Sequence, residues 1–294
     1  MKIDFGRVIT AMVTPFKADG SLDVDEAVRL ANYLAEHGSD AVALAGTTGE
    51  SPTLTNEEER TLFQEVKKGL NGKAKVLAGA GSNSTATAVK YTRRAEALGV
   101  DGSLLVVPYY NKPTQEGLYQ HFKAVNDAAG LPLMLYNIPA RTGRNMEPET
   151  TLRLAALPNY FAIKEASGDL EQIKKIIAGA PEDFLVYSGD DSMTLDVLKA
   201  GGYGVVSVAS HLAGRKIKKM IEACLAGDAA GAEQLNKELD EIFQVIFITT
   251  NPAPIKAALN MLGFQCGLPR LPLVDLNAGE KEKLRTVLQR CKLL

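Results

Sequence analysis

The sequence predicts an α/β protein, a (β/α)8 TIM barrel with a C-terminal helical extension. Eight short runs of β-branched and aliphatic residues recur along the chain and alternate with amphipathic helical patterns. The runs are almost continuously apolar, as expected for parallel strands that are buried on both faces. A doubly wound open sheet is the main competitor, but no Gly-x-Gly-x-x-Gly motif follows the first run. Eight such units in a row therefore favour a closed barrel.

The predicted strands share a short apolar composition, and polar residues follow most of them. They are Val8–Val13, Ala41–Ala45, Lys75–Ala78, Ser103–Val107, Leu133–Tyr136, Phe161–Lys164, Leu185–Ser188 and Gly204–Val208. Helices are predicted between them, and residues that can act as N-caps mark where several begin. Thr55 with Glu58 fits a capping box. The other predicted helix starts are at Asp23, Thr114, Asp169 and Asp191.

The chain divides by pattern into a barrel over residues 1–227 and a C-terminal extension over residues 228–294. The extension opens with a helical stripe that includes Leu235, Leu239 and Ile242. Asn251-Pro252-Ala253-Pro254 interrupts this pattern, and two further helices are expected after it. We do not expect the extension to be an independent functional module.

Composition narrows the functional class. The chain has 294 residues, of which 46% are hydrophobic and 23% charged, with a net charge of −2. These values exclude a disordered chain and a strongly basic nucleic-acid-binding surface. The expected partner is a small molecule or another copy of the chain.

The sequence gives no support for a metal site, a disulfide framework or a membrane span. The few cysteines and histidines are scattered, without metal-ligand or paired-cysteine spacing: Cys224, Cys266, Cys291, His37, His121 and His211. The N-terminus has no signal-peptide pattern, and no apolar run is long enough to cross a membrane. A cytoplasmic location is therefore expected.

Polar segments follow several predicted strands, and a barrel gathers such segments at one mouth, where its active site lies. Hydroxyls, tyrosines, an arginine and a lysine would converge there, but paired carboxylates and a Ser-His-Asp set are missing. The segments are Gly46-Thr47-Thr48-Gly49-Glu50-Ser51, Pro108-Tyr109-Tyr110-Asn111, Tyr136-Asn137-Ile138-Pro139-Ala140-Arg141-Thr142-Gly143, Ile163-Lys164-Glu165-Ala166-Ser167 and Ser188-Gly189-Asp190-Asp191.

Lys164 is the residue that most strongly indicates a type of chemistry. It closes an apolar strand and is expected to point into a partly dry barrel interior, where burial disfavours the charged ammonium. A neutral amine can attack a carbonyl and form a Schiff base. Tyr136 ends the neighbouring strand and could shuttle protons beside such an amine. Taken alone, however, Lys164 could equally reach the surface from a strand end, and Tyr136 could be a core tyrosine.

The remaining polar segments allow both a binding and a structural interpretation. The turn at Thr47-Thr48 offers backbone N–H groups and hydroxyls suited to a carboxylate, but it could also be an ordinary strand-to-helix loop. Arg141 could bind a second carboxylate through two hydrogen bonds, or could be a surface arginine. Gly189-Asp190-Asp191 is better interpreted as a turn plus an N-cap than as a catalytic carboxylate pair.

Together, these segments resemble the pyruvate-dependent class I aldolase superfamily, which includes the N-acetylneuraminate lyases, and within it the dihydrodipicolinate synthase family. The resemblance covers essentially the whole chain. It is carried by Gly46-Thr47-Thr48-Gly49-Glu50, by Pro108-Tyr109-Tyr110-Asn111-Lys112-Pro113, by Tyr136 to Gly143 and by Ile163 to Ser167.

The resemblance implies a Schiff-base condensation of pyruvate with L-aspartate 4-semialdehyde, a lyase-type step of the diaminopimelate route of lysine biosynthesis. Lys164 would form the imine and Tyr136 would transfer protons. Thr47 and Tyr110 would complete a proton relay, with Tyr110 entering from a neighbouring subunit of a homotetramer built as a dimer of dimers. The imine itself would serve as the electron sink, so that no metal or other cofactor is required.

The same resemblance assigns substrate-binding residues. Thr48 and the main chain at Val206 would hold pyruvate, Arg141 would recognise the carboxylate of the semialdehyde, and Gly189 would shape the pocket near the lysine. Arg141 favours this family over N-acetylneuraminate lyases, which generally lack an arginine after the Tyr-Asn-Ile-Pro turn. The pair Thr47-Thr48 favours it too, because a Ser-Thr pair is common in those lyases.

Several alternatives stay open. Sugar-acid aldolases such as 2-keto-3-deoxygluconate aldolase share the superfamily with the neuraminate lyases. A non-catalytic keto-acid-binding barrel is disfavoured because both Lys164 and Tyr136 are present. A metal-dependent aldolase is disfavoured because its histidine ligands are missing from the sequence pattern.

The chain departs from lysine-sensitive members of the family at two positions. Those members commonly carry a histidine at the position of Glu59 and an acid at the position of Thr87. Ser51, Asn83 and Tyr109 still match the effector site. We therefore predict weak or absent feedback inhibition by lysine.

Overall fold

The computed structural model describes residues 4–294. The eight strands form a closed barrel of parallel strands in the order β1 to β8, which confirms the predicted (β/α)8 fold and excludes the open sheet. The bounds differ from the predicted runs by at most two residues. The strands are β1 (Val8–Ala11), β2 (Ala41–Leu44), β3 (Lys75–Gly79), β4 (Gly102–Val106), β5 (Leu133–Asn137), β6 (Tyr160–Glu165), β7 (Leu185–Ser188) and β8 (Gly204–Ser207).

Helices connect the strands and continue beyond the last one. They are α1 (Val24–Glu36), the 3-10 turn η1 (Ser51–Thr53), α2 (Asn56–Leu70), α3 (Thr85–Ala97), α4 (Gln115–Ala128), α5 (Pro139–Thr142), α6 (Pro148–Ala155), α7 (Leu170–Gly179), α8 (Thr194–Lys199), α9 (Ser210–Leu225), α10 (Ala229–Val245), α11 (Ala253–Met261) and α12 (Ala278–Arg290). The two helices predicted after the interruption at residues 251–254 are confirmed as α11 and α12.

The chain divides into two compact units, which are described separately. Unit 1 consists of the segment up to Arg7 together with Val76–Val206, and unit 2 consists of Val8–Lys75 together with Ser207–Leu294. The predicted boundary at residue 227 is a different partition and stays a prediction.

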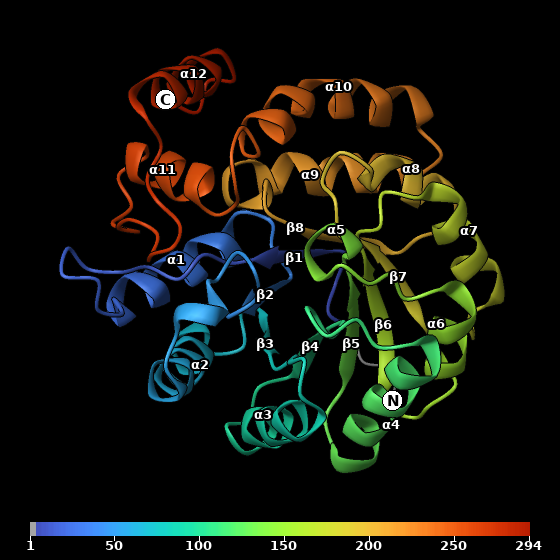
Figure 1. Ribbon diagram of the computed structural model, residues 1–294. Helices are drawn as coiled ribbons and strands as arrows, with labels where there is room; N and C mark the ends of the chain where they lie inside the picture. The colour runs from blue at the N-terminus through green and yellow to red at the C-terminus, as the bar shows by residue number, and fades with distance from the viewer. Residues whose placement is uncertain (1–3) are drawn as a thin grey trace. The chain divides into compact units, whose positions relative to one another are not determined.

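Unit 1 is built on the parallel pairing of β3 through β7, which continues into β8. Its helices pack in chain order, with α3 against α4, α4 against α6 and α6 against α7 (Figure 1). Aliphatic side chains such as Leu105, Leu135 and Ile163 are fully buried in its strands. Burial of this apolar surface supplies most of the driving force that keeps the strand ends in place.

Unit 2 contains the β1–β2 pair with α1 packed against α2, and the C-terminal helices (Figure 1). Helix α9 packs on β1 and runs beside α10, while α12 packs against both α10 and α11. Leu239, Ile242 and Leu284 bury the apolar stripes of α10 and α12. None of the helices within residues 4–294 combines the length and the apolar character needed to cross a bilayer.

The helix starts follow the predicted capping chemistry except at one position. The Thr55 hydroxyl accepts from the Glu58 N–H at 3.1 Å while the Glu58 carboxylate accepts from the Thr55 N–H at 2.9 Å, which is the predicted capping box. The side chains of the other predicted caps, Asp23, Thr114 and Asp169, also accept N–H bonds of the first turn.

The prediction that Asp191 caps a helix is wrong. Helix α8 begins at Thr194 and has Met193 at its N-cap, without a side-chain cap bond. The preceding turn extends further than predicted because Asp190 Oδ1 accepts from both the N–H and the hydroxyl of Ser192, at 2.9 and 2.8 Å. Asp191 is therefore buried inside that turn, and its carbonyl accepts from the Thr194 N–H.

Candidate active site

Lys164 and Tyr136 lie side by side in unit 1. They are register partners on the parallel strands β6 and β5, so their side chains project to the same face of the sheet. The Nζ atom of Lys164 is 4.3 Å from the centroid of the Tyr136 ring, and the two residues are only 6% and 5% exposed. Within residues 4–294 no hydrogen bond or ion pair is made by this Nζ. The structure thus presents a buried amine next to a phenol, without a counter-ion.

Glu165 follows Lys164 directly but does not neutralise it, because successive residues of a strand project to opposite faces. Its carboxylate accepts from Asn137 Nδ2 at 3.0 and 3.1 Å, from Gln172 Nε2 at 3.3 Å and from the Ser167 N–H at 2.7 Å. Burial raises the pKa of Glu165, and these hydrogen bonds act in the opposite direction. All of these donors are neutral, so this carboxylate is satisfied without a cation.

Gly189 leaves room for the stem of Lys164. Its N–H donates to the Glu165 carbonyl at 2.7 Å, which brings its Cα close to β6. A Cβ at this position would lie 3.0 Å from Cγ of Lys164 and 2.7 Å from Cβ of Ala166. Any larger residue would therefore displace the lysine side chain or the neighbouring loop.

Tyr110, in the loop between β4 and α4, and Arg141, in α5, both belong to unit 1 and are exposed to solvent. The Tyr110 N–H donates to the Thr142 carbonyl at 3.3 Å, which ties its loop to the end of α5. Its ring is 88% exposed and makes little contact with the rest of its own chain. Its φ of +73° lies in the left-handed region, where a tyrosine is strained. Arg141, in α5, is exposed and makes no ion pair with any of the residues 4–294.

Thr47 and Thr48 form a tight turn in unit 2. The Glu50 N–H donates to the Thr47 carbonyl at 3.1 Å, and the Ser51 N–H donates to the Gly46 carbonyl at 3.2 Å. Glycine is required at position 49 because a Cβ there would lie 2.8 Å from the Ala45 nitrogen. Thr47 is half-buried, whereas Thr48 is buried and its Oγ1 accepts from Asn251 Nδ2 at 2.8 Å.

A buried ion pair holds the next part of this turn. Lys256 of α11 donates to Glu50 Oε1 at 2.8 Å and to the carbonyls of Thr14 and Leu268 at 3.0 and 3.1 Å. The Arg270 N–H donates to the other oxygen of Glu50 at 2.8 Å. Burial lowers the pKa of Lys256, while the charge of Glu50 acts in the opposite direction. These contacts hold Glu50 in a left-handed conformation, with φ of +55°.

Sequence reasoning did not identify Asn251 or Lys256. Asn251 belongs to the helix-breaking segment Asn251-Pro252-Ala253-Pro254, and a polar residue within such a segment can bind a side chain elsewhere in the fold. The signal at Lys256 was a lysine inside an otherwise apolar helical pattern, Pro254 to Leu259. That pattern indicates a buried charge, and a buried charge requires a partner.

The remaining predicted site residues fall in both units. Val206 lies in β8 and is buried. Of the predicted effector positions, Ser51 and Glu59 belong to unit 2, and the Ser51 hydroxyl donates to Glu59 Oε1 at 3.4 Å. Asn83, Thr87 and Tyr109 belong to unit 1.

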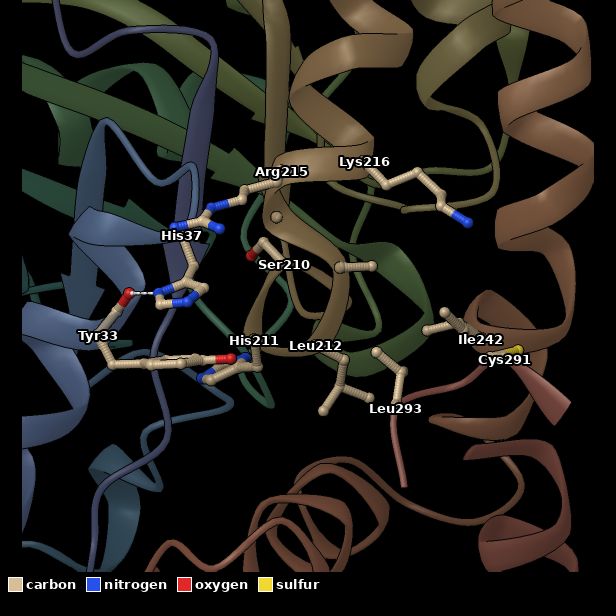
Figure 2. A pocket seen from close by; sticks show the side chains of 12 residues that line it. Tyr33, His37, Ser210, His211, Leu212, Arg215, Lys216, Ile242, Cys291 and Leu293 are labelled. Atoms are coloured by element: carbon tan, nitrogen blue, oxygen red, sulfur yellow. Dashed lines mark hydrogen bonds between the residues drawn. The ribbon is translucent and has the colours of Figure 1, made fainter. Parts of the chain in front are cut away.

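A cavity of about 190 Å³ lies in unit 2, between α1, α9, α10 and the C-terminal end of the chain. Figure 2 shows Tyr33 and His37 on one side of it and Leu293 and Cys291 on the other. None of the predicted catalytic residues lines this cavity.

The histidines of this cavity are structural. His211 accepts the Val13 N–H at Nε2 and donates from Nδ1 to the Val208 carbonyl, at 3.2 and 2.8 Å. Burial lowers its pKa to about 4, which keeps the ring neutral. Nδ1 of His37 bonds the Tyr33 carbonyl at 2.7 Å, and the two rings stack (Figure 2). Within residues 4–294, moreover, His, Cys, Asp and Glu side chains form no group of three or more that could hold a metal ion.

Comparisons with known proteins identify the family of the chain. The sequence matches the Dihydrodipicolinate synthetase family over residues 4–291. It is 59% identical over 292 residues to a 4-hydroxy-tetrahydrodipicolinate synthase of Moorella thermoacetica, an alignment that covers 99% of this chain and 100% of that protein.

Solved structures give the same result. The chain is similar to a dihydrodipicolinate synthase of Cyanidioschyzon merolae with lysine bound, with 51% identity, a TM-score of 0.97 and 99% of each chain covered. It is also similar to the chloride-inhibited dihydrodipicolinate synthase of Acinetobacter baumannii complexed with pyruvate. That structure has 38% identity and a TM-score of 0.96, with 99% of this chain and 100% of the other covered. The chain, with its buried Lys164 beside Tyr136, thus belongs to the dihydrodipicolinate synthetase family.

Proposed function

We propose that the chain catalyses the condensation of pyruvate with L-aspartate 4-semialdehyde, the reaction of 4-hydroxy-tetrahydrodipicolinate synthases on the diaminopimelate route to lysine. The observation that carries this proposal is the Nζ atom of Lys164, which is buried 4.3 Å from the Tyr136 ring centroid and has no counter-ion among the described residues. An amine held in this way is suited to attack a ketone. The full-length similarity to synthases of this reaction supports the choice of substrates.

The proposed chemistry begins with attack of the Lys164 amine on the keto carbon of pyruvate. Loss of water gives the imine, and loss of a methyl proton gives the enamine. The former methyl carbon then attacks the aldehyde of the semialdehyde, and the aldehyde oxygen becomes a hydroxyl group. The amine of the semialdehyde attacks the imine carbon, closes the ring and releases Lys164. Tyr136 supplies and removes the protons in these steps.

Thr47 and Tyr110 complete a proton relay with Tyr136 in this proposal. The 88% exposure of the Tyr110 ring supports its insertion into the site of a neighbouring subunit, because the ring makes little contact within its own chain. Burial of a large aromatic side chain in an interface would also offset the strain of its positive φ. The proposed assembly is a homotetramer, a dimer of dimers.

Thr48 and the main chain at Val206 are proposed to bind pyruvate, and Arg141 to bind the carboxylate of the semialdehyde. The exposed guanidinium of Arg141, which has no ion pair among the described residues, supports this role. Gly189 keeps the space that Lys164 occupies. The imine supplies the electron sink, so no metal or other cofactor is required, and the proposed location is the cytoplasm.

Feedback by lysine is proposed to be weak or absent, because Glu59 and Thr87 replace residues of the family's effector site. Glu59 is buried and already accepts from Ser51, one of the matching effector residues. A lysine titration of the reaction rate tests this proposal, and strong inhibition at low lysine concentration would contradict it.

The acceptor is tested first. Purified enzyme is given pyruvate with L-aspartate 4-semialdehyde or, in a parallel reaction, with N-acetylmannosamine, and pyruvate consumption is followed. Rapid consumption with the semialdehyde alone is expected. Consumption only with the sugar would assign the chain to the neuraminate lyases and would overturn the role of Arg141.

A further inference from the structure

Asn251 makes a direct side-chain contact with Thr48. It lies in the segment between α10 and α11, is 4% exposed, and its Nδ2 donates to Thr48 Oγ1 at 2.8 Å. Both residues are buried in unit 2, although 203 positions separate them in the sequence. The contact therefore joins the C-terminal extension to the Gly46–Ser51 turn.

The direction of this hydrogen bond determines what Thr48 can do. A hydroxyl group has one proton to donate and rotates to suit its surroundings. Because the Asn251 amide donates to Thr48 Oγ1, the threonine proton is turned away from Asn251 and is available to another acceptor. A carboxylate is such an acceptor, and hydrogen bonds to an ionised group are the strong ones.

The carbonyl oxygen of the Asn251 amide makes no hydrogen bond to any residue that the structure describes, so the amide is not explained by a full set of hydrogen bonds of its own. Its Oδ1 is buried, and no donor within residues 4–294 reaches it. Leaving a buried acceptor unpaired is unfavourable for folding. An aliphatic residue would fill the same space without leaving an acceptor unpaired. The presence of an amide is therefore explained by the hydrogen bond that its Nδ2 donates to Thr48.

The C-terminal extension also holds the turn at a second point, two residues further on. Lys256 Nζ and the Arg270 N–H bind the two oxygens of Glu50, each at 2.8 Å. The turn is thus held at the side chain of Glu50 and by the main-chain hydrogen bonds of Glu50 and Ser51, while Asn251 contacts the side chain of Thr48. This separation makes Asn251 a candidate for side-chain positioning rather than for turn formation.

We propose that Asn251 is a positioning residue that orients the Thr48 hydroxyl as a donor to the carboxylate of the bound 2-keto acid. This inference rests on the proposed function, in which Thr48 binds pyruvate. It assigns to the C-terminal extension an indirect part in substrate binding, through a residue that acts on Thr48 and itself touches no reacting atom.

The test compares Asn251→Ala, Asn251→Asp and Thr48→Val with the unmodified enzyme. One readout is the pyruvate KM with saturating semialdehyde. The other is the pyruvate concentration that gives half-maximal borohydride trapping of the imine, which requires no acceptor. Asn251→Ala is expected to raise both by about tenfold, the effect of one hydrogen bond to a charged group, with a smaller change in kcat. Asn251→Asp keeps the shape but removes the donor and adds a negative charge, so its effect is expected to be larger.

A double variant distinguishes an effect of Asn251 through Thr48 from a general loss of structure. If Asn251 acts through Thr48, the pyruvate KM of Asn251→Ala/Thr48→Val equals that of Thr48→Val alone. The matched control is Asn260→Ala in the same extension, whose amide bonds only the main chain of Gly267 and Cys266, each at 2.9 Å. The control is expected to unfold at a lower temperature with an unchanged pyruvate KM.

An unchanged pyruvate KM in Asn251→Ala, or effects of the two single variants that add in the double variant, would overturn the inference. If Asn251→Ala does not fold, the near-isosteric Asn251→Asp decides on the same criteria. Failure of the proposed function looks different, because the unmodified enzyme would then form no borohydride-trapped adduct with pyruvate.

Discussion

Two buried lysines, one in each unit, occupy similar surroundings but form different contacts. Lys164 is 6% exposed with its Nζ 4.3 Å from the centroid of the Tyr136 ring, and Lys256 is 1% exposed with its Nζ 4.2 Å from that of the Phe16 ring. Each also has a buried glutamate within its unit, Glu165 and Glu50. Only Lys256 is paired with its glutamate.

The difference lies in how each carboxylate is satisfied. Glu50 binds a cation, so Lys256 is fixed as a structural crosslink. Glu165 accepts only from the neutral donors Asn137, Gln172 and Ser167, on the opposite face of β6 from Lys164. Burial of a lysine is therefore not enough to indicate a nucleophile. A buried lysine that makes no ion pair, and whose neighbouring glutamate in the same strand is satisfied by neutral groups, is the stronger indication.

The largest expected effect separates the two lysines chemically. Borohydride reduction in the presence of pyruvate is expected to label Lys164 and to leave Lys256 unlabelled, because Lys256 is only 1% exposed and its Nζ is already bound to Glu50 Oε1 at 2.8 Å. Lys164→Arg is expected to lower kcat by about a thousandfold or more and to abolish the adduct. Peptide mapping by mass spectrometry provides the measurement. An adduct on Lys256, or one that persists in Lys164→Arg, would remove the distinction.

For stability we expect the opposite: substitution of Lys256 should have a larger effect on the free energy of unfolding than substitution of Lys164. Lys256→Met leaves Glu50 buried without its cation, and the free energy of unfolding should fall by about 3–5 kcal/mol. Lys164→Met should cost much less, since that lysine has no ion pair among the described residues. Urea unfolding measures both values, and Glu50→Gln/Lys256→Met should recover part of the loss. Equal losses for the two single variants would show that the lysines do not differ in this way.

The smallest expected effect is a pH dependence of the free energy of unfolding that comes from the titration of Glu165. Because burial raises its pKa above the ordinary 4.5, the folded protein holds this proton at pH values where the unfolded chain has lost it. The stability from this group is thus fully present below pH 4.5 and is lost as the pH rises through the folded pKa. Relative to Glu165→Gln, the natural enzyme should lose up to about 1.4 kcal/mol per pH unit in that window.

Urea unfolding of both proteins at several pH values upward from 4.5 measures this difference. A difference that stays constant with pH, or that grows in favour of glutamate, would contradict the assigned direction. Lys256 and Glu50 are left intact in both proteins, so the experiment reports on the carboxylate beside Lys164 alone.

The barrel and the Lys164 region could be predicted because their signals are local. Apolar runs fixed the strands to within two residues, and Lys164 and Tyr136 stand at the ends of two consecutive runs. Register then places them together. Asp191 was predicted wrongly because a turn residue and an N-cap have the same residue preferences, and only the hydrogen bonds of Asp190 decide between them.

The contacts of the C-terminal extension carry no such local signal. Asn251 and Thr48 are 203 positions apart, and Lys256 and Glu50 are 206 apart. Motifs of a few residues cannot reveal which side chains meet over that distance. A single sequence therefore indicated the residues of the turn but not what holds them.

The partners of this turn also have a consequence for the order of synthesis. A ribosome makes Thr48 and Glu50 early, whereas Asn251, Lys256 and Arg270 are among the later residues to be added. A nascent chain that ends before residue 251 holds the turn sequence without the amide and the cation that fix it. The contacts that hold this turn are consequently completed late in translation, and a chain that ends between residues 165 and 250 would retain Lys164 but lack the Asn251 amide at Thr48.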